Sequence, residues 1–413
     1  MKNNNQSGMM EDFVLLHRVA QRINSNLDID SLLEEIVNDV SRTFGCSRLA
    51  VLLKDDRTME LVVGADCGGD ANQHIKGERI KIGEYGMVGH VGAMGETYYA
   101  PDVSIDPYYR VSDSQTRSEV DIPLRSHGRL IGVLNAQSKE LDGFSPARIQ
   151  LLETLGGHIT TAIENARMFQ RERAEKERMA KELSEAQRIQ RSLFPPASPT
   201  LPGFIVDGKC LPCQEVGGDW YDYIPLQDGR LAVVLADISG KGMGAAMLMS
   251  STRTVLRLVA ESGLSPSEVL CRVNHLLLKD FPAAKFVTMV YAILDPKRRD
   301  VVFANAGHCL PLLAGVTGTE FLATDSGLPL GIQDCSISER KISLKAGTRL
   351  VFYSDGLTEA MNSSLEQYGE QRLSEHLAHR SSSVESLLHD AEIFRGGHPA
   401  SDDLTVVMIQ AKE

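Results

Sequence analysis

Four acidic residues in the second half of the chain are placed where they could do chemistry together. Each lies at or near the end of a probable strand: Asp219 in EVGGDWYD, Asp237 in LAVVLADISG, Asp355 in VFYSDGL and Asp402 in ASDDLTVV. One acid at a strand end is usually solvated, but several carboxylates gathered in one place repel unless cations lie among them. All-oxygen ligands without paired Cys or His favour Mg²⁺ or Mn²⁺ over zinc. The sequence therefore predicts a site for divalent cations, Mn²⁺ or Mg²⁺.

The stretch EVGGDWYDY (residues 215–223) also allows a different interpretation, because diguanylate cyclases carry a similar GGD string. A cyclase would need Glu-Phe after the GGD, and this chain has Trp220 and Tyr221. It would also need the string deep within its domain, and here it lies near the start of one. The acidic set with its strand-end placement is the better account.

Length, charge and cysteine usage limit the class of protein. The 413 residues are enough for two or three domains, and the net charge of −12 disfavours binding to nucleic acid or an anionic membrane. No apolar run is long enough to span a bilayer, and the N-terminus lacks the apolar core of a secretory signal. Seven scattered cysteines fit a reducing compartment, so a cytoplasmic protein is expected. Cys210 and Cys213 form a lone CxxC, better explained as two reduced thiols than as half of a zinc site.

The first 165 residues alternate helical and strand patterns. Two amphipathic helices are expected within 12–44. Asp30 or Ser31 can cap the second, and the capping-box spacing of Ser31 and Glu34 favours Ser31. Strand-like runs follow, and a long helix begins at Ser145-Pro146. This α+β pattern resembles a GAF sensor domain over roughly 12–165, most strongly in the closing segment GVLNAQSKELDGFSPARIQLLETLGGHITTAIENA. Cys67 as a bilin attachment and His90 as a haem ligand are weighed against ordinary structural roles, which are more common. The ligand of this domain is unknown from the sequence.

The stretch from Ile163 to Phe194 contains no Gly or Pro and is rich in strong helix formers. A 4-3 spacing places apolar and polar side chains on one seam: Phe169, Glu172, Lys176, Met179, Leu183, Ala186, Gln190 and Leu193. This pattern predicts a weak dimeric coiled coil, and the alternative is a solvated single helix held by pairs such as Glu172–Lys176. Pro195-Pro196 ends the helix. The predicted domains are thus 1–165, a linker at 166–196 and a third unit at 197–413.

The third unit is similar to the SpoIIE/RsbU branch of the type 2C (PPM) serine/threonine phosphatases. Eight motifs occur in the family's order between about Ala186 and Gln410: AQRIQRSLFPP, EVGGDWYD, ADISGKGMGAAM, KFVTMVYAILD, ANAGHCLPLL, GLPLGI, FYSDGLTEAMN and SDDLTVVMI. The resemblance implies a β-sandwich flanked by helices, with two divalent cations at one edge. The fold class expected for the whole chain is α+β.

The resemblance also implies roles for individual residues. Asp237 would bridge both cations, followed by the carbonyl of Ile238 as a backbone ligand. Asp219 would hold one cation, while Asp355 and Asp402 would hold the other. Three further residues are expected beside the site rather than as established ligands: Gly218, Asp403 (where eukaryotic members usually have Asn) and His308, which is either a general acid or, more commonly, part of a structural turn. No counterpart of the family's phosphate-gripping Arg is found.

In this family, water activated by the two cations attacks phosphorus in line, and a serine or threonine oxygen leaves. The implied substrate is a phosphorylated STAS-type antagonist of an anti-sigma factor. The alternative function is a catalytically inactive docking module in partner switching, controlled by the GAF domain. A homodimer formed through the GAF domain and the linker is expected, and the linker would transmit the GAF signal to the first turn and the helix 244–260.

Overall fold

The computed structural model describes residues 28–412, apart from 70–74, 85, 112, 283, 317, 325–326 and 335. The helix expected before residue 27 and Cys335 therefore lie outside the described residues. The chain divides into two compact units, Met1–Arg178 and Met179–Glu413. This division falls within the predicted linker, in the middle of one continuous helix. None of the helices in the described ranges is long and apolar enough to cross a membrane.

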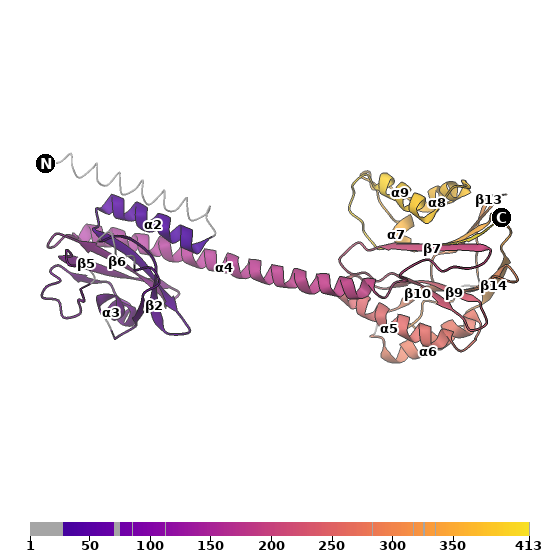
Figure 1. Ribbon diagram of the computed structural model, residues 1–413, viewed down its shortest axis with the longest axis horizontal. Helices are drawn as coiled ribbons and strands as arrows, with labels where there is room; N and C mark the ends of the chain where they lie inside the picture. The colour runs from indigo at the N-terminus through magenta and orange to yellow at the C-terminus, as the bar shows by residue number, and fades with distance from the viewer. Residues whose placement is uncertain are drawn as a thin grey trace. The chain divides into compact units, whose positions relative to one another are not determined.

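The N-terminal unit is built on one antiparallel sheet with strand order β3-β2-β1-β6-β5-β4. Its strands are β1 (Arg48–Asp55), β2 (Glu60–Gly68), β3 (Arg79–Lys81), β4 (Tyr98–Ala100), β5 (Ser118–Ser126) and β6 (Arg129–Ser138). Helix α2 (Ile29–Phe44) and the first part of α4 (Pro146–Arg191) cover one face, and α3 (Gly86–Met94) covers the other (Figure 1). The expected α+β sensor architecture is confirmed.

The two faces of this sheet differ in chemistry because side chains alternate along each strand. On β5, Val120, Ile122 and Leu124 pack with α2 and α4 in the main apolar core. The positions between them face α3. Helix α2 starts one turn earlier than the capping-box spacing predicts: Asp28, not Ser31, is its N-cap, and its carboxylate accepts hydrogen bonds from the amide and hydroxyl of Ser31.

Helix α4 has 46 residues and ends at Arg191, four positions before the first proline. Its middle stretch carries the i,i+4 ion pairs that suit a solvated helix: Glu172 lies 2.8 Å from Lys176, and Arg173 lies 2.9 Å from Glu177. Phe169 and Met179, two members of the expected seam, are exposed in the single chain. The continuous helix is as predicted, and its coiled-coil pairing stays a prediction.

The C-terminal unit is a sandwich of two five-stranded antiparallel sheets. One sheet has the order β14-β11-β10-β9-β8 and the other β13-β12-β15-β16-β7, with the bounds β7 (Phe204–Leu211), β8 (Trp220–Pro225), β9 (Leu231–Ile238), β10 (Val287–Asp295), β11 (Asp300–Ala306), β12 (Leu312–Gly315), β13 (Gly318–Phe321), β14 (Glu339–Ser343), β15 (Arg349–Tyr353) and β16 (Leu404–Ala411). The inner faces meet in an apolar core that includes Val233, Phe303, Phe352 and Val407. The β-sandwich flanked by helices is confirmed.

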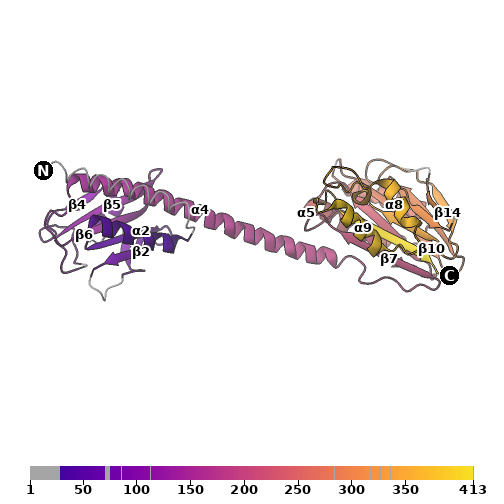
Figure 2. The same cartoon turned by 90° about the horizontal axis from the view of Figure 1, so that it is seen from above.

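Helices cover both outer faces of the sandwich (Figure 1). Helices α5 (Gly242–Ala260) and α6 (Pro266–Asp280) pack on the first sheet, and α7 (Asp355–Thr358), α8 (Gly369–Ala378) and α9 (Val384–Arg395) pack on the second. Seen from above, α8 and α9 lie across the strands of that second sheet (Figure 2). Helix α5 begins two residues before the predicted start at Gly244.

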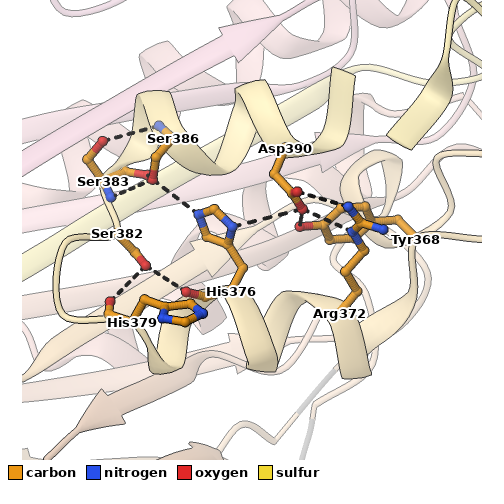
Figure 3. A network of polar contacts seen from close by, with 8 residues as sticks. All are labelled: Tyr368, Arg372, His376, His379, Ser382, Ser383, Ser386 and Asp390. Carbon is orange, nitrogen blue, oxygen red and sulfur yellow. Dashed lines mark hydrogen bonds and ion pairs between the residues drawn. The ribbon is translucent and has the colours of Figure 1, made fainter. Parts of the chain in front are cut away.

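A network of polar contacts joins α8 to α9 (Figure 3). Asp390 on α9 accepts hydrogen bonds from the hydroxyl of Tyr368 at 2.6 Å and from two nitrogens of Arg372 at 2.9 and 3.0 Å. On the same side, His376 Nε2 lies 3.1 Å from the Ser386 hydroxyl. The hydrogen bonds from Arg372, and next the one from Tyr368, lower the pKa of Asp390 to about 2. The network ties the two outer helices together.

Candidate metal centre

The predicted acids come from both sheets of the C-terminal unit and from the segments at the ends of their strands. Asp219 directly precedes β8, and Asp237 is the next-to-last residue of β9. On the second sheet, Asp355 begins α7 just after β15, and Asp402 and Asp403 directly precede β16. The backbone of Gly218 lies beside Asp237 Oδ1 and donates a hydrogen bond to Asp403. Gly356, which follows Asp355, packs against the carbonyl of Asp403, and Thr405 donates a hydrogen bond to Asp219. These contacts bring the acids of both sheets together.

Asp219 and Asp237 form the buried part of the cluster. Asp219 is 3% exposed, and its Oδ2 accepts a hydrogen bond of 2.6 Å from the hydroxyl of Thr405. Burial, and next the charge of Asp237, raise the pKa of Asp219 well above the ordinary range. Burial also raises the pKa of Asp237 to about 7, with the charges of Asp355 and Asp402 adding to the effect. Carboxylates held this way are stabilised by bound cations.

The more open part of the cluster has a basic partner in Lys241. Its ammonium lies 2.9 Å from Asp402 Oδ2 and also donates to the carbonyl of Ser401. Asp355 has its pKa raised by burial and by the charges of Glu359 and Asp402. Among the described residues, Lys241 is the one lysine or arginine that forms an ion pair with any of the five acids. One ammonium cannot balance the four carboxyl groups of Asp219, Asp237, Asp355 and Asp402, so the donor set fits divalent cations.

Asp403 uses its carboxylate to hold backbone rather than to face the cluster. Its Oδ1 accepts from the amide of Cys213 at 2.8 Å, and its Oδ2 accepts from the amides of Gly218 at 2.8 Å and Asp219 at 3.3 Å. These bonds support the expectation that Asp403 positions the loop before β8 and is not itself a cation ligand.

Cys213, Asp402 and Asp403 bring three potential ligand atoms close enough to share one metal ion. We do not favour this trio. The Cys213 sulfur is a soft ligand, which suits zinc better than the Mg²⁺ or Mn²⁺ that an oxygen donor set favours. The oxygens of Asp403 are already occupied by backbone amides.

The two glycines before Asp219 are required by close contacts. A Cβ on Gly217 would overlap the Asp403 carboxylate, and a Cβ on Gly218 would lie 2.7 Å from the carbonyl oxygen of Ile238. The Gly218 backbone is therefore packed directly against the carbonyl that is predicted to be a backbone ligand. The same Cβ would lie 3.5 Å from Asp237 Oδ1. This places Gly218, Asp237 and Ile238 together.

Sequence reasoning did not single out Lys241 or Thr405, and it missed the role of Gln190 near the end of α4. Its Nε2 donates to the carbonyl of Gly217 at 2.7 Å, and its Oε1 accepts from the amide of Gly217 at 3.1 Å. The side chain is 8% exposed. Its assignment to a coiled-coil seam was therefore wrong, because a glutamine that completes the hydrogen bonds of a buried peptide group cannot face a partner helix. The signal was its place within AQRIQRSLFPP, a motif shared with the family.

His308 lies in a turn that is stabilised by a hydrogen bond from its backbone amide. Its amide donates to the Asn305 side chain at 2.7 Å, and its Nδ1 lies 2.7 Å from the hydroxyl of Thr288. Thr288 pairs with Asp237 across β9 and β10, so the ring lies one side chain away from the cluster. Burial lowers the pKa of His308 to about 4. A neutral, buried imidazole in a hydrogen-bonded turn fits the structural role better than the general-acid role.

Comparison with known families divides the chain as the fold does. Residues 28–163 match the GAF domain, and residues 227–412 match Stage II sporulation protein E (SpoIIE). The second match includes Asp237, Asp355 and Asp402 but begins after Asp219. In fold, the chain is similar to the SiaA-PP2C domain of Pseudomonas aeruginosa, with a TM-score of 0.51 and 21% identity over 57% of this chain and 98% of that one.

The chain thus carries a GAF domain over residues 28–163 and a SpoIIE-type domain over residues 227–412, within a unit that has the type 2C phosphatase fold. Its relatives include phosphoserine phosphatase RsbU of Bacillus subtilis, 27% identical over 56% of this chain and 70% of RsbU. Phosphoserine phosphatase RsbP of the same organism is 25% identical over 48% of this chain and 50% of RsbP. Protein IcfG of Synechocystis is 25% identical over 55% of this chain, which spans 41% of IcfG.

Proposed function

We propose that this chain is a signal-regulated, metal-dependent serine/threonine protein phosphatase. One observation carries the proposal: four carboxyl groups from two facing sheets, those of Asp219, Asp237, Asp355 and Asp402, gather in one place and have, within the described ranges, a single lysine as counter-charge. Such a set is costly for a protein that does not bind cations. Two relatives are named phosphoserine phosphatases, which supports the same reaction class.

In this proposal Asp219, Asp237, Asp355 and Asp402 hold two cations, Mn²⁺ or Mg²⁺, together with the carbonyl of Ile238. The bound cations would neutralise the phosphoryl oxygens and lower the pKa of a water molecule that attacks phosphorus. The protein's own contribution is positional. Asp403 and Gln190 fix the loop that carries Asp219, and Thr405 orients the Asp219 carboxylate.

The substrate we propose is a phosphorylated protein of the STAS type. The support is the resemblance to the RsbU branch. The GAF domain would regulate the reaction through α4 in a homodimer formed by the GAF domain and the linker. Light scattering on the whole chain, compared with a chain that begins at Met179, tests the dimer: the whole chain should be dimeric and the shorter one monomeric.

The alternative is an inactive docking module with the same fold. Hydrolysis of p-nitrophenyl phosphate separates the two. An active enzyme should hydrolyse it in Mn²⁺, lose the activity in a chelator and regain it when Mn²⁺ is restored. Absence of metal-dependent turnover in the purified full chain would favour the docking module.

A further inference from the structure

The face of the N-terminal sheet that is turned toward α3 carries two buried acids that the phosphatase reaction does not use. Glu119 and Asp121 lie two positions apart on β5 and so point to the same side of the sheet. Glu119 is 4% exposed and Asp121 is 0% exposed. The other face of the sheet packs on α2 and α4.

The described neighbours of the acid pair are polar but do not neutralise its charge. The strand register places Asn135 opposite Asp121 and Gln137 opposite Glu119. The amide of Asn135 donates to Glu119 at 2.9 Å and to Asp121 at 2.7 Å. Within the described part of the chain, no lysine or arginine forms an ion pair with either acid, and every Lys and Arg between residues 28 and 163 is described. Arg48 lies on β1, which β6 separates from β5, and is paired with Asp66.

One oxygen of the pair has a donor only when the pair holds a proton. Asp121 Oδ2 is fully buried, and no donor within the described ranges reaches it while both carboxyl groups are ionised, whereas a protonated Glu119 donates a hydrogen bond to Asp121. Burial, and next the charge of Asp121, raise the pKa of Glu119 well above the ordinary range. A buried carboxylate oxygen without a hydrogen bond is costly, so a donor supplied from outside the chain would stabilise it.

Three rings lie beside the acids on the same face. Tyr98 pairs with Asp121 across β4 and β5. His90 of α3 stacks on Tyr108 at 3.9 Å between ring centroids, and Tyr98 meets both rings edge-on. Tyr108 is 41% exposed, so the rings extend from the row of Asp121 to the surface. Aromatic faces attract cations, and a cluster of rings next to buried carboxylates suits a ligand with a positive charge.

The donor set favours an organic cation over a metal ion. Among the described residues, three His, Cys, Asp or Glu ligand atoms lie close enough to hold one metal ion at Cys213, Asp402 and Asp403. Glu119 and Asp121 are not part of such a group. The two carboxylates offer fewer oxygens than the six to eight that Ca²⁺ takes, and the Asn135 amide directs N–H donors, not a ligand oxygen, toward them. An ammonium group brings three N–H donors and one charge, which can satisfy both carboxylates at once.

We propose that the GAF domain binds a small molecule bearing a primary ammonium group, which Glu119 and Asp121 accept between them while His90, Tyr98 and Tyr108 contact its body. This inference is independent of the proposed phosphatase reaction. The alternative explanation is that Glu119 and Asp121 share one proton and have a structural role only.

Isothermal titration calorimetry on the full chain tests the proposal with defined probes: the free amino acids, ethanolamine and putrescine. At least one probe should bind, and its N-acetylated form, which lacks the charge, should not. Asp121→Asn and Glu119→Gln should each weaken that binding at least tenfold, while Glu96→Gln, an exposed acid in the same unit, should leave it unchanged.

The proposal is overturned if none of these amines binds at millimolar concentration, or if binding survives in Asp121→Asn with unchanged affinity. It is also overturned if the N-acetylated form binds as well as the free amine. This last comparison uses the unmodified protein, so it holds even where a variant does not fold. If the parent binds no amine and both amide variants melt at a higher temperature than the parent, the two acids are a proton-sharing pair that serves only the fold.

Discussion

The side chain of Gln190 and the backbone of Gly217 are joined by two reciprocal hydrogen bonds, 2.7 and 3.1 Å long. Gln190 lies one residue before the end of α4, and Gly217 lies two residues before Asp219. The last turn of the long helix therefore holds the loop that presents a predicted cation ligand. A cavity of about 280 Å³ lies beside this contact, lined by Gln187, Phe194, Cys210, Glu215 and Tyr221 among others.

Replacing Gln190 by Ala should lower phosphatase turnover about tenfold or more, a loss of about 1.4 kcal/mol of transition-state stabilisation. The buried amide and carbonyl of Gly217 lose their partners, so the Asp219 carboxylate is less well positioned. Steady-state kinetics against Mn²⁺ concentration provides the measurement. Gln187→Ala is the matched control, since Gln187 lines the same cavity without bonding the loop. Equal effects of the two substitutions would show that the hydrogen bonds do not matter.

Phosphatase activity should depend on the rotation of α4 between the GAF domain and the phosphatase domain. Residues inserted one at a time after Glu177, in the exposed stretch of α4, each turn a continuous helix by about 100°. If α4 carries the GAF signal to the Gly217 loop, activity should vary with the number inserted and recover near seven. Assay of the whole series is required. A flat response would mean that α4 is a passive tether.

Gly217→Ala should reduce activity strongly because the new Cβ would overlap the Asp403 carboxylate, which holds the amides of Gly218 and Asp219. Gly244→Ala is the control. A Cβ on Gly244, in the first turn of α5, meets nothing within 4 Å, so this variant should keep its activity. Parallel assays and melting curves of the two proteins distinguish a local effect from unfolding. An active Gly217→Ala enzyme would contradict the described loop.

The α8–α9 network should make stability depend on pH in acid. The pKa of Asp390 is lowered from 3.8 to about 2, so its contribution is fully present above pH 4 and is lost as pH falls toward 2. The contribution is about 1–2 kcal/mol after allowance for partial exposure. Urea unfolding of the parent and of Arg372→Met at pH 5 and pH 3 measures it. The variant should be less stable at pH 5 and should lose less between the two values. An identical loss in both proteins would exclude the network as the cause.

Much of the fold was accessible from the sequence because its signals are local. Asp237 follows the apolar run of β9, and Pro195 lies just past the end of α4, so strand ends and helix length could be predicted. The acids could be grouped because four carboxylates at strand ends are costly to bring together unless cations bind them. The capping residue of α2 was misplaced because Asp28 and Ser31 both have suitable side chains, and the choice depends on backbone conformation.

The roles of Gln190 and Asp403 depend on contacts between segments far apart in the chain. Gln190 has the spacing of a seam residue, and nothing in its neighbours reveals that Gly217 lies against it. Asp403 could be separated from Asp402 only by the resemblance to the family, whereas the structure supplies the reason in three backbone amides. The sequence did not reveal that Glu119 and Asp121 are buried. Their burial depends on α3, which covers that face of the sheet and is far from β5 in the chain.

The central claim is that Asp237 holds the cations on which turnover depends. It is tested most directly by measuring Mn²⁺-dependent hydrolysis of p-nitrophenyl phosphate by Asp237→Asn beside the parent, with circular dichroism to verify the fold. An amide binds these cations far less well than a carboxylate, so we expect a folded protein with turnover reduced by at least about 10³-fold. Near-parental turnover of Asp237→Asn in saturating Mn²⁺ would contradict the account.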